Sequence, residues 1–93
     1  MNLKWKLFAN FAEVAGMREI EIETYKGLTV ENAMESLFER IPKLREEIFD
    51  ENDRVYEHVK ILHNGGEIKQ IRYNETIVFE GDELAVIPPM SGG

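Results

Sequence analysis

The last two residues of the sequence, Gly92 and Gly93, are of a type and in a position that could support chemistry. Glycine has no Cβ, so a Gly-Gly end can thread into a channel too narrow for other residues and present its main-chain carboxylate there. The predicted reactive group is therefore the carboxylate of Gly93. Small residues at a chain end are also often frayed and without function, so the rest of the sequence has to distinguish the two interpretations.

A stiff Pro-Pro pair precedes this end of the sequence. Proline fixes φ and has no N–H, so Pro88 and Pro89 should end the pairing of the strand before them and continue as a short extended stalk. We therefore expect residues 1–88 to form the folded domain and residues 89–93, which include Met90 and Ser91, to protrude from it.

Length and composition restrict the class of protein. A chain of 93 residues is one domain, and such a domain buries roughly 60–65% of its unfolded surface. This is enough for a stable core without a structural metal ion or a disulfide. The absence of cysteine excludes a disulfide, a thiolate metal site and a cysteine nucleophile. The net charge of −7 argues against nucleic acid as a partner. No apolar run approaches a membrane span and no signal-peptide core is visible, so we expect no membrane partner and a cytoplasmic location.

The first quarter of the chain predicts two strands. The first residues show a period of two that is typical of a half-buried strand. Leu3, Trp5, Leu7 and Ala9 form one set, and they alternate with Lys4, Lys6 and Phe8. Residues 10–16 are interpreted as a turn-like break closed by Gly16, and residues 19–23 as a second strand with glutamates on one face, suited to a sheet edge. The two strands should form an antiparallel hairpin.

The middle of the chain predicts one main helix. Thr29 is placed to cap it, Pro42 marks its end, and the apolar stripe is formed by Val30, Ala33, Met34, Leu37, Phe38 and Ile41. A further helical turn is expected over residues 43–49. A third strand is predicted over residues 59–62, stopped by the turn signal Asn64-Gly65-Gly66, with a short edge strand at residues 70–73. The apolar run of residues 83–87 suits a central strand covered on both faces.

This order of elements predicts an α+β fold of the β-grasp (ubiquitin-like) type, a mixed sheet of four to five strands holding one main helix. In that arrangement the first and last strands are parallel neighbours. The end of the chain then leaves from the middle of the sheet.

The sequence resembles the ubiquitin-like sulfur carriers, specifically the small subunit of molybdopterin synthase (MoaD) and the archaeal small modifier proteins. The resemblance spans the whole chain and is carried by these motifs: Leu7-Phe8-Ala9 with Glu13 and Ala15-Gly16, Asn64-Gly65, Gly81-Asp82-Glu83, Pro88-Pro89 and Gly92-Gly93. Residues 68–78 match it weakly, and Met90-Ser91 departs from the usual small or aliphatic pair.

The resemblance implies chemistry at Gly93 with no bound cofactor. A ubiquitin-activating-type adenylating enzyme (MoeB-like) would use Mg-ATP to couple the Gly93 carboxylate to AMP. Attack by persulfide sulfur would give a thiocarboxylate, which the large subunit of molybdopterin synthase (MoaE-like) would use to make the dithiolene. Attack by a lysine of a target protein would instead give an isopeptide.

Strand alternation predicts a partner-binding patch beside the stalk. Phe8 and Leu62 should lie on the sheet face opposite the helix, together with either Ala85 or Ile87. The predicted partner-binding residues are therefore Phe8, Leu62, Ile87, Pro88, Pro89, Met90 and Ser91. Isolated exposed apolar residues are also common, and these residues can simply pack under a loop.

Other candidate sites are weaker. His58 and His63, in or beside a strand, should point to opposite faces and are interpreted as ordinary surface or edge residues, so no metal site is predicted. No set of nucleophile, base and orienting group is apparent, and the chain alone should not be an enzyme. Three hypotheses remain: a sulfur carrier, a covalent protein modifier, and a ubiquitin-like binding module whose tail is inert.

Overall fold

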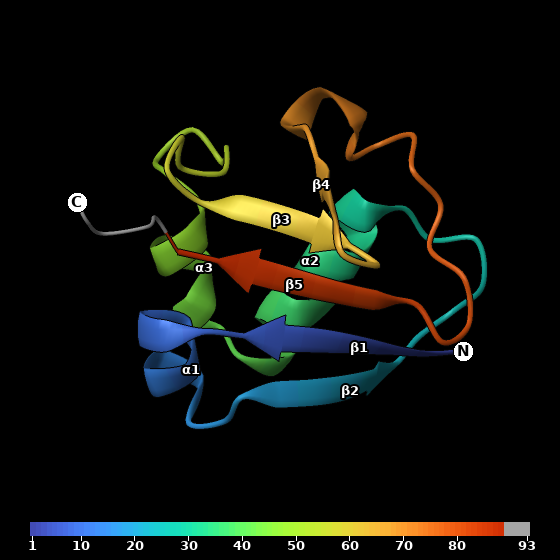
Figure 1. Ribbon diagram of the computed structural model, residues 1–93, viewed down its shortest axis with the longest axis horizontal. Coiled ribbons are helices and arrows are strands. Elements are labelled where there is room, and N and C mark those ends of the chain that lie inside the picture. The colour runs from blue at the N-terminus through green and yellow to red at the C-terminus, as the bar shows by residue number, and fades with distance from the viewer. Residues whose placement is uncertain (89–93) are drawn as a thin grey trace.

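The computed structural model describes residues 1–88 as a five-stranded sheet with helices packed against one of its faces (Figure 1). The elements in chain order are β1 (Asn2–Leu7), α1 (Ala9–Ala15), β2 (Glu19–Glu23), α2 (Val30–Arg40), α3 (Lys43–Ile48), β3 (Lys60–His63), β4 (Gly66–Ile68), a 3₁₀ turn η1 (Gln70–Arg72) and β5 (Glu83–Ile87). The strand order is β2-β1-β5-β3-β4, with β1 and β5 parallel and the other pairs antiparallel. This is the β-grasp topology, with the last strand in the centre as predicted.

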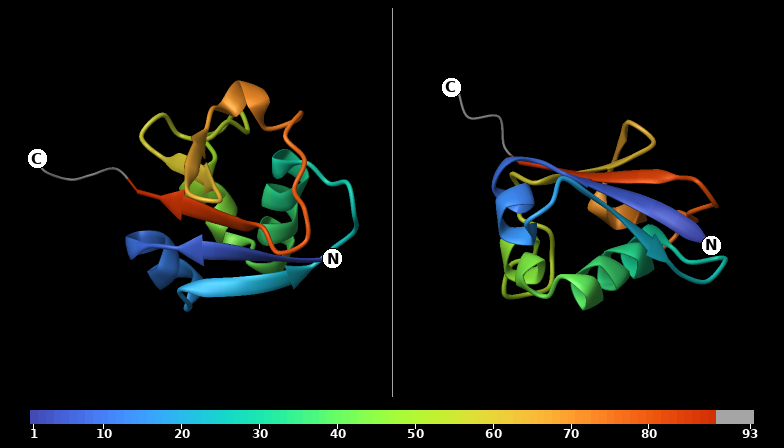
Figure 2. Two further views of the ribbon diagram at one scale, coloured as in Figure 1. Left: turned by 45° about the vertical axis from the view of Figure 1, so that its right-hand side comes forward. Right: turned by 90° about the horizontal axis from the view of Figure 1, so that it is seen from below.

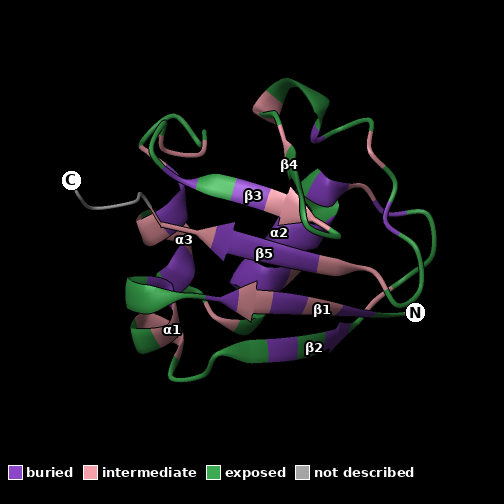
Figure 3. Ribbon diagram, in the orientation of Figure 1, coloured by how far each residue is buried: buried purple, intermediate pink, exposed green. Residues whose placement is uncertain are grey.

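Strand alternation produces the core. The inward residues of β1 are buried, and Trp5 is fully so, with its indole Nε1 donating a hydrogen bond to the main-chain oxygen of Ala33 at 3.2 Å. The middle of β5 (Leu84, Ala85 and Val86) is buried on both faces, as its continuous apolar run predicts (Figure 3). The edge strand β2 alternates instead, with Ile20 and Ile22 inside and its three glutamates exposed.

The main helix begins and ends where the sequence places it. Thr29 forms a capping box with Asn32, in which the Thr29 hydroxyl accepts from the Asn32 N–H and the Asn32 side chain accepts from the Thr29 N–H, both at 3.2 Å. The apolar stripe of α2 is buried against the sheet. Helix α3 follows, and the Arg45 guanidinium lies 5.5 Å from the centre of the Phe38 ring and 5.3 Å from that of the Phe49 ring, which ties α3 to α2.

The turn predicted for residues 10–16 is wrong, because helix α1 occupies Ala9–Ala15. Ala9 has a φ of 49°, which turns the chain sharply after β1, and the following helical turn buries Phe11 in the core. Gly16 closes the segment as predicted, in the left-handed conformation with a φ of 75°. The two strands still form the predicted antiparallel hairpin, with α1 inserted between them.

The short edge strand is also misplaced in the prediction, since it occupies Gly66–Ile68 and not residues 70–73. Asn64 and Gly65 both have positive φ, 51° and 87°, and form a two-residue hairpin turn that returns the chain at once beside β3. Residues 70–72 form η1 instead, which delivers Tyr73 into the core. Within residues 1–88, no helix is long and apolar enough to cross a bilayer.

Candidate docking site at the end of the central strand

The site begins where β5 ends. Leu7 of β1 pairs with Val86, and Lys60 of β3 pairs with Ile87, so the chain reaches Pro88 with a strand on each side. The predicted reactive residues Gly92 and Gly93, and the predicted contact residues Pro89, Met90 and Ser91, lie outside the described residues.

Three of the four predicted contact residues within residues 1–88 lie on the same face of the sheet, and the fourth, Pro88, follows β5 directly and is half-buried. All helices pack on the opposite face, as the edge-on view shows (Figure 2). Leu62 lies opposite Ala85, whose neighbour on the same face is Ile87, and Phe8 follows directly after β1 beside the end of β5. Phe8 is 43% exposed, and Leu62 and Ile87 are half-buried. The alternative between Ala85 and Ile87 is resolved, since both face this way, although Ala85 is buried. We call Phe8, Leu62 and Ile87 the outer-face patch.

Charged side chains of β1, β2 and β5 lie on the β1 side of the outer-face patch. Lys6 of β1 forms an ion pair with Glu83 of β5 at 3.4 Å, and Lys4 approaches Glu19 of β2 at 3.9 Å. These pairs are solvent-exposed and contribute little to stability. An apolar centre with a polar rim is the usual composition of a protein-binding surface.

A cavity of about 560 Å³ opens beside Phe8, and its existence was not apparent from the sequence. Its walls are Lys6, Leu7, Phe8, Ala9, Ala12, Arg18 and Glu19. Ala12 and Arg18 reach it because α1 folds back beside the end of β1. A signal for α1, and so for the position of Ala12, is present in the helical spacing of Phe11, Ala12 and Ala15, within the segment predicted as a turn.

The other end of the sheet carries a polar cluster built around Asp82. Its carboxylate lies 2.7 Å from His63 Nε2 and accepts hydrogen bonds from Asn64 Nδ2 at 3.1 Å and from the Phe79 N–H at 2.9 Å. Partial burial acts to raise the pKa of Asp82, but the hydrogen bonds from Phe79, His63 and Asn64 outweigh it and hold this pKa below its usual value.

This cluster corrects the interpretation of His63 as an ordinary surface or edge residue, because His63 is half-buried against Asp82 and lies on β3, between β5 and β4. His58 is exposed and stacks on the Tyr56 ring with 5.4 Å between the centroids. Across residues 1–88, no group of three or more potential metal ligands comes together.

A β-grasp body whose outer sheet face is not covered by a helix within residues 1–88, and a central strand that leads toward a Gly-Gly sequence, define the class of ubiquitin-fold carrier and modifier proteins. The ThiS family model matches residues 5–93, and the chain belongs to that family.

Curated relatives span 98% or more of the chain. It is 37% identical over 91 residues to small archaeal modifier protein 1 of Haloferax volcanii, covering 98% of this chain and 100% of the relative. It is 29% identical over 93 residues to the molybdopterin synthase sulfur carrier subunit of Arabidopsis thaliana, covering 100% of this chain and 84% of the relative. The crystal structure of the Haloferax volcanii SAMP1 protein superimposes with a TM-score of 0.88, at 35% identity and full coverage of both chains. These likenesses confirm the fold and the family inferred from the motifs.

Proposed function

We propose that this protein is a sulfur carrier that is activated and loaded at the carboxylate of Gly93. The observation that supports this most strongly is the parallel pairing of β1 with the central strand β5, which brings the end of β5 beside the end of β1, where the exposed Phe8 follows. An enzyme that docks on the outer-face patch then has its active site within reach of the residues that follow. The chain itself supplies no catalytic group in this proposal.

The proposed loading proceeds in three steps. The Gly93 carboxylate attacks the α-phosphorus of Mg-bound ATP, which releases pyrophosphate and leaves an acyl adenylate. A persulfide sulfur then attacks the acyl carbon and displaces AMP. A thiolate finally attacks the donor's sulfur in the resulting acyl disulfide, so that the S–S bond breaks, a new disulfide forms between the thiol and the donor, and a thiocarboxylate is left on Gly93. The adenylating enzyme provides the catalytic groups and the ATP site, and this chain provides the docking surface and the acyl group.

The proposed acceptor is the pterin precursor of the molybdenum cofactor, with this chain as the small subunit of molybdopterin synthase. The likeness to the sulfur carrier subunit of Arabidopsis thaliana supports this role. The large subunit would bind the outer-face patch and hold the thiocarboxylate at its own active site.

A second candidate function is covalent protein modification. It is favoured by the higher identity, 37%, to a relative named as a modifier. In this route a lysine amine of a target protein attacks the same acyl adenylate, AMP leaves, the nitrogen loses a proton, and an isopeptide forms. Both functions need a free carboxylate on Gly93, so they share the activation step.

Intact-mass analysis tests both functions. The purified protein is incubated with Mg-ATP, an adenylating enzyme from the same cells and a persulfide donor, and we expect one oxygen to be exchanged for sulfur. Isopeptide-linked conjugates formed in cell extract would support the modifier function. The matched control lacks Gly93 and should show neither product. An unchanged mass together with an absence of conjugates in the unaltered protein would overturn the proposal.

A further inference from the structure

The edge strand β2 presents unused main-chain groups. Met1 and Thr24 exchange both main-chain hydrogen bonds, at 2.8 and 2.7 Å, immediately beyond the ends of β1 and β2. Hydrogen-bonded and non-hydrogen-bonded pairs alternate along an antiparallel ladder, so the N–H and C=O groups of Glu19, Glu21 and Glu23 point away from β1. Within residues 1–88 no other strand pairs with this edge.

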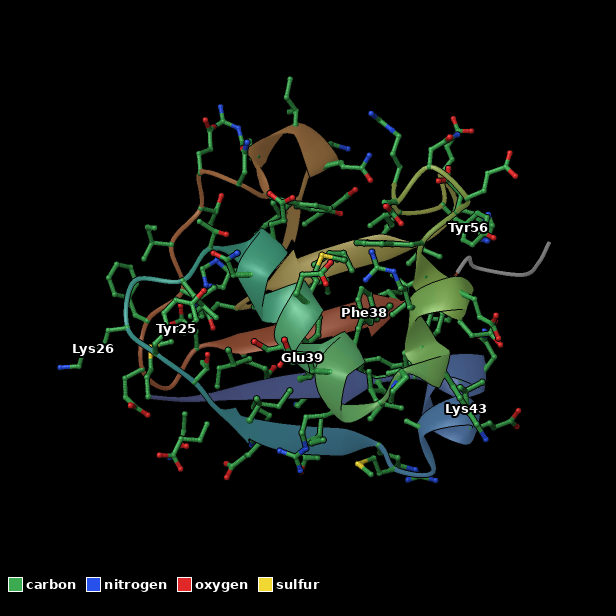
Figure 4. All side chains as sticks on the ribbon, turned by 180° about the vertical axis from the view of Figure 1, so that it is seen from behind. Tyr25, Lys26, Phe38, Glu39, Lys43 and Tyr56 are labelled. Carbon is green, nitrogen blue, oxygen red and sulfur yellow. The ribbon has the colours of Figure 1, made fainter. Side chains whose placement is uncertain are left out.

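A groove runs between this free edge and helix α2. Its volume is about 540 Å³, and its walls come from the end of β2, the following loop and the exposed side of the helix. The lining residues that matter here are Ile22 and Tyr25, which give an apolar floor and wall, and the carboxylates of Glu23, Glu35 and Glu39. Tyr25 and Glu39 are labelled in Figure 4, on the loop and on α2.

The charge of this region is predominantly negative. Glu21, Glu23 and Glu39 have no ion-pair partner among residues 1–88, whereas Glu35 is held by Arg45 at 3.2 Å. Arg40 is the one basic residue that lines the groove within the described part of the chain. A negatively charged strand edge beside a negatively charged groove favours a basic occupant.

A second copy of this chain is a poor occupant of the edge. Pairing of β2 with β2 of another molecule would place glutamates against glutamates, and like charges directly opposite each other destabilise a sheet. The existing neighbour of β2 shows the complementary pattern, because Lys4 and Lys6 of β1 stand opposite Glu21 and Glu19.

We propose that the β2 edge and the β2–α2 groove bind an extended segment of a partner protein in which lysine or arginine alternates with aliphatic residues. The segment adds to β2 as an antiparallel sixth strand, pairing with the main chain of Glu19, Glu21 and Glu23. Its basic side chains lie beside these glutamates on the outer face. Its aliphatic side chains lie on the helix side, over Ile22 and Tyr25. This site is separated from β5 by β1 and is independent of the chemistry proposed for Gly93.

The test uses the full-length protein and a fluorescein-labelled peptide in which four lysines alternate with three valines. We expect saturable binding in an anisotropy titration, weakening as salt is raised, and NMR shift changes concentrated in residues 19–25 and 32–40. Glu21→Lys should weaken binding about fivefold, because a favourable cross-strand pair becomes a repulsive one. Glu39→Lys gives a second variant outside the sheet, and Glu57→Lys, at an exposed loop position, is the control with the same change in net charge.

A second peptide pair tests the main-chain pairing. Methylation of the lysine amide nitrogens blocks the hydrogen bonds to β2 and should abolish binding, whereas methylation of the valine nitrogens, which face solvent, should leave it unchanged. Absence of binding would overturn the inference. Equal weakening by Glu57→Lys and Glu21→Lys, or equal affinity of the two methylated peptides, would overturn it as well, since either result indicates diffuse charge attraction.

Discussion

Asn64 and Glu83 hold each other through two hydrogen bonds across the β3–β5 pair. The Asn64 N–H donates to the main-chain oxygen of Glu83 at 2.7 Å, and the Glu83 N–H donates to the side-chain oxygen of Asn64 at 2.9 Å. Two of the short motifs that indicated the family, Asn64-Gly65 and Gly81-Asp82-Glu83, are therefore one structural unit. This unit fixes the start of the central strand, whose other end leads to the Gly-Gly sequence.

Replacement of Asn64 tests the importance of this unit. Asn64→Ala loses the side-chain bonds to Glu83 and Asp82 and places alanine at a φ of 51°. We expect a loss of about 2–4 kcal/mol in the free energy of unfolding. Asn64→Gly is the matched control, because it removes the same bonds but tolerates the positive φ, and it should lose less. Urea denaturation measures both, and equal losses would show that backbone strain is not involved.

The lowered pKa of Asp82 predicts that the free energy of unfolding depends on pH. Its folded pKa lies below its unfolded value of about 3.9, so the ionised carboxylate stabilises the fold above that pH. This contribution is lost as the pH falls through the folded pKa. Asp82→Asn should therefore be less stable than the unaltered protein at pH 7 by about 1–2 kcal/mol. The difference should shrink below about pH 4.

Parallel urea titrations at neutral and at acid pH measure this change. A difference between the two proteins that is the same at every pH would contradict a role for the ionised form of Asp82. His63→Gln serves as a comparison, because it can retain a hydrogen bond to Asp82 but cannot carry a positive charge.

The outer-face patch makes a prediction about partner binding. Leu62→Glu should weaken binding to the adenylating enzyme tenfold or more, because truncation or charging of a central contact residue costs about 2 kcal/mol or more. Ile71→Glu is the control, since Ile71 is apolar and 84% exposed but lies on η1, away from the patch. Surface plasmon resonance with each variant gives the affinities. Unchanged binding by Leu62→Glu would rule out the patch as a docking site.

The single tryptophan offers a test of the core. Trp5 is fully buried, and its indole donates a hydrogen bond to Ala33 in the adjacent helix. Trp5→Phe should lower the free energy of unfolding by about 1–3 kcal/mol, because it removes this bond and leaves a void between the sheet and α2. Circular dichroism monitors unfolding of both proteins. An equally stable variant would indicate that the surrounding side chains close the void.

The sequence by itself determined the elements whose signals are local. Thr29 and Pro42 set the limits of α2 because a cap and a helix breaker act within one turn. The alternation of Leu3, Trp5 and Leu7 identified the inward face of β1, because side chains on a strand point alternately to its two faces. The unbroken apolar run of β5, which lacks this alternation, placed β5 in the centre of the sheet, covered on both faces. The motifs along the whole chain indicated the family that the comparisons confirm.

The tertiary structure decided what depends on contacts between distant segments. Helix α1 forms although its seven residues are too few to be stable alone, because burial of Phe11 against the core supports it. The edge strand forms at Gly66–Ile68 because the Asn64-Gly65 turn places these residues directly beside β3. By composition alone, residues 70–73 are an equally good candidate for this strand. The groove beside β2 is formed by segments that are far apart in the sequence, and so is the hydrogen-bonded unit of Asn64 and Glu83. No local sequence pattern relates these segments. Long-range packing and hydrogen bonding, which local periodicity does not encode, create both features.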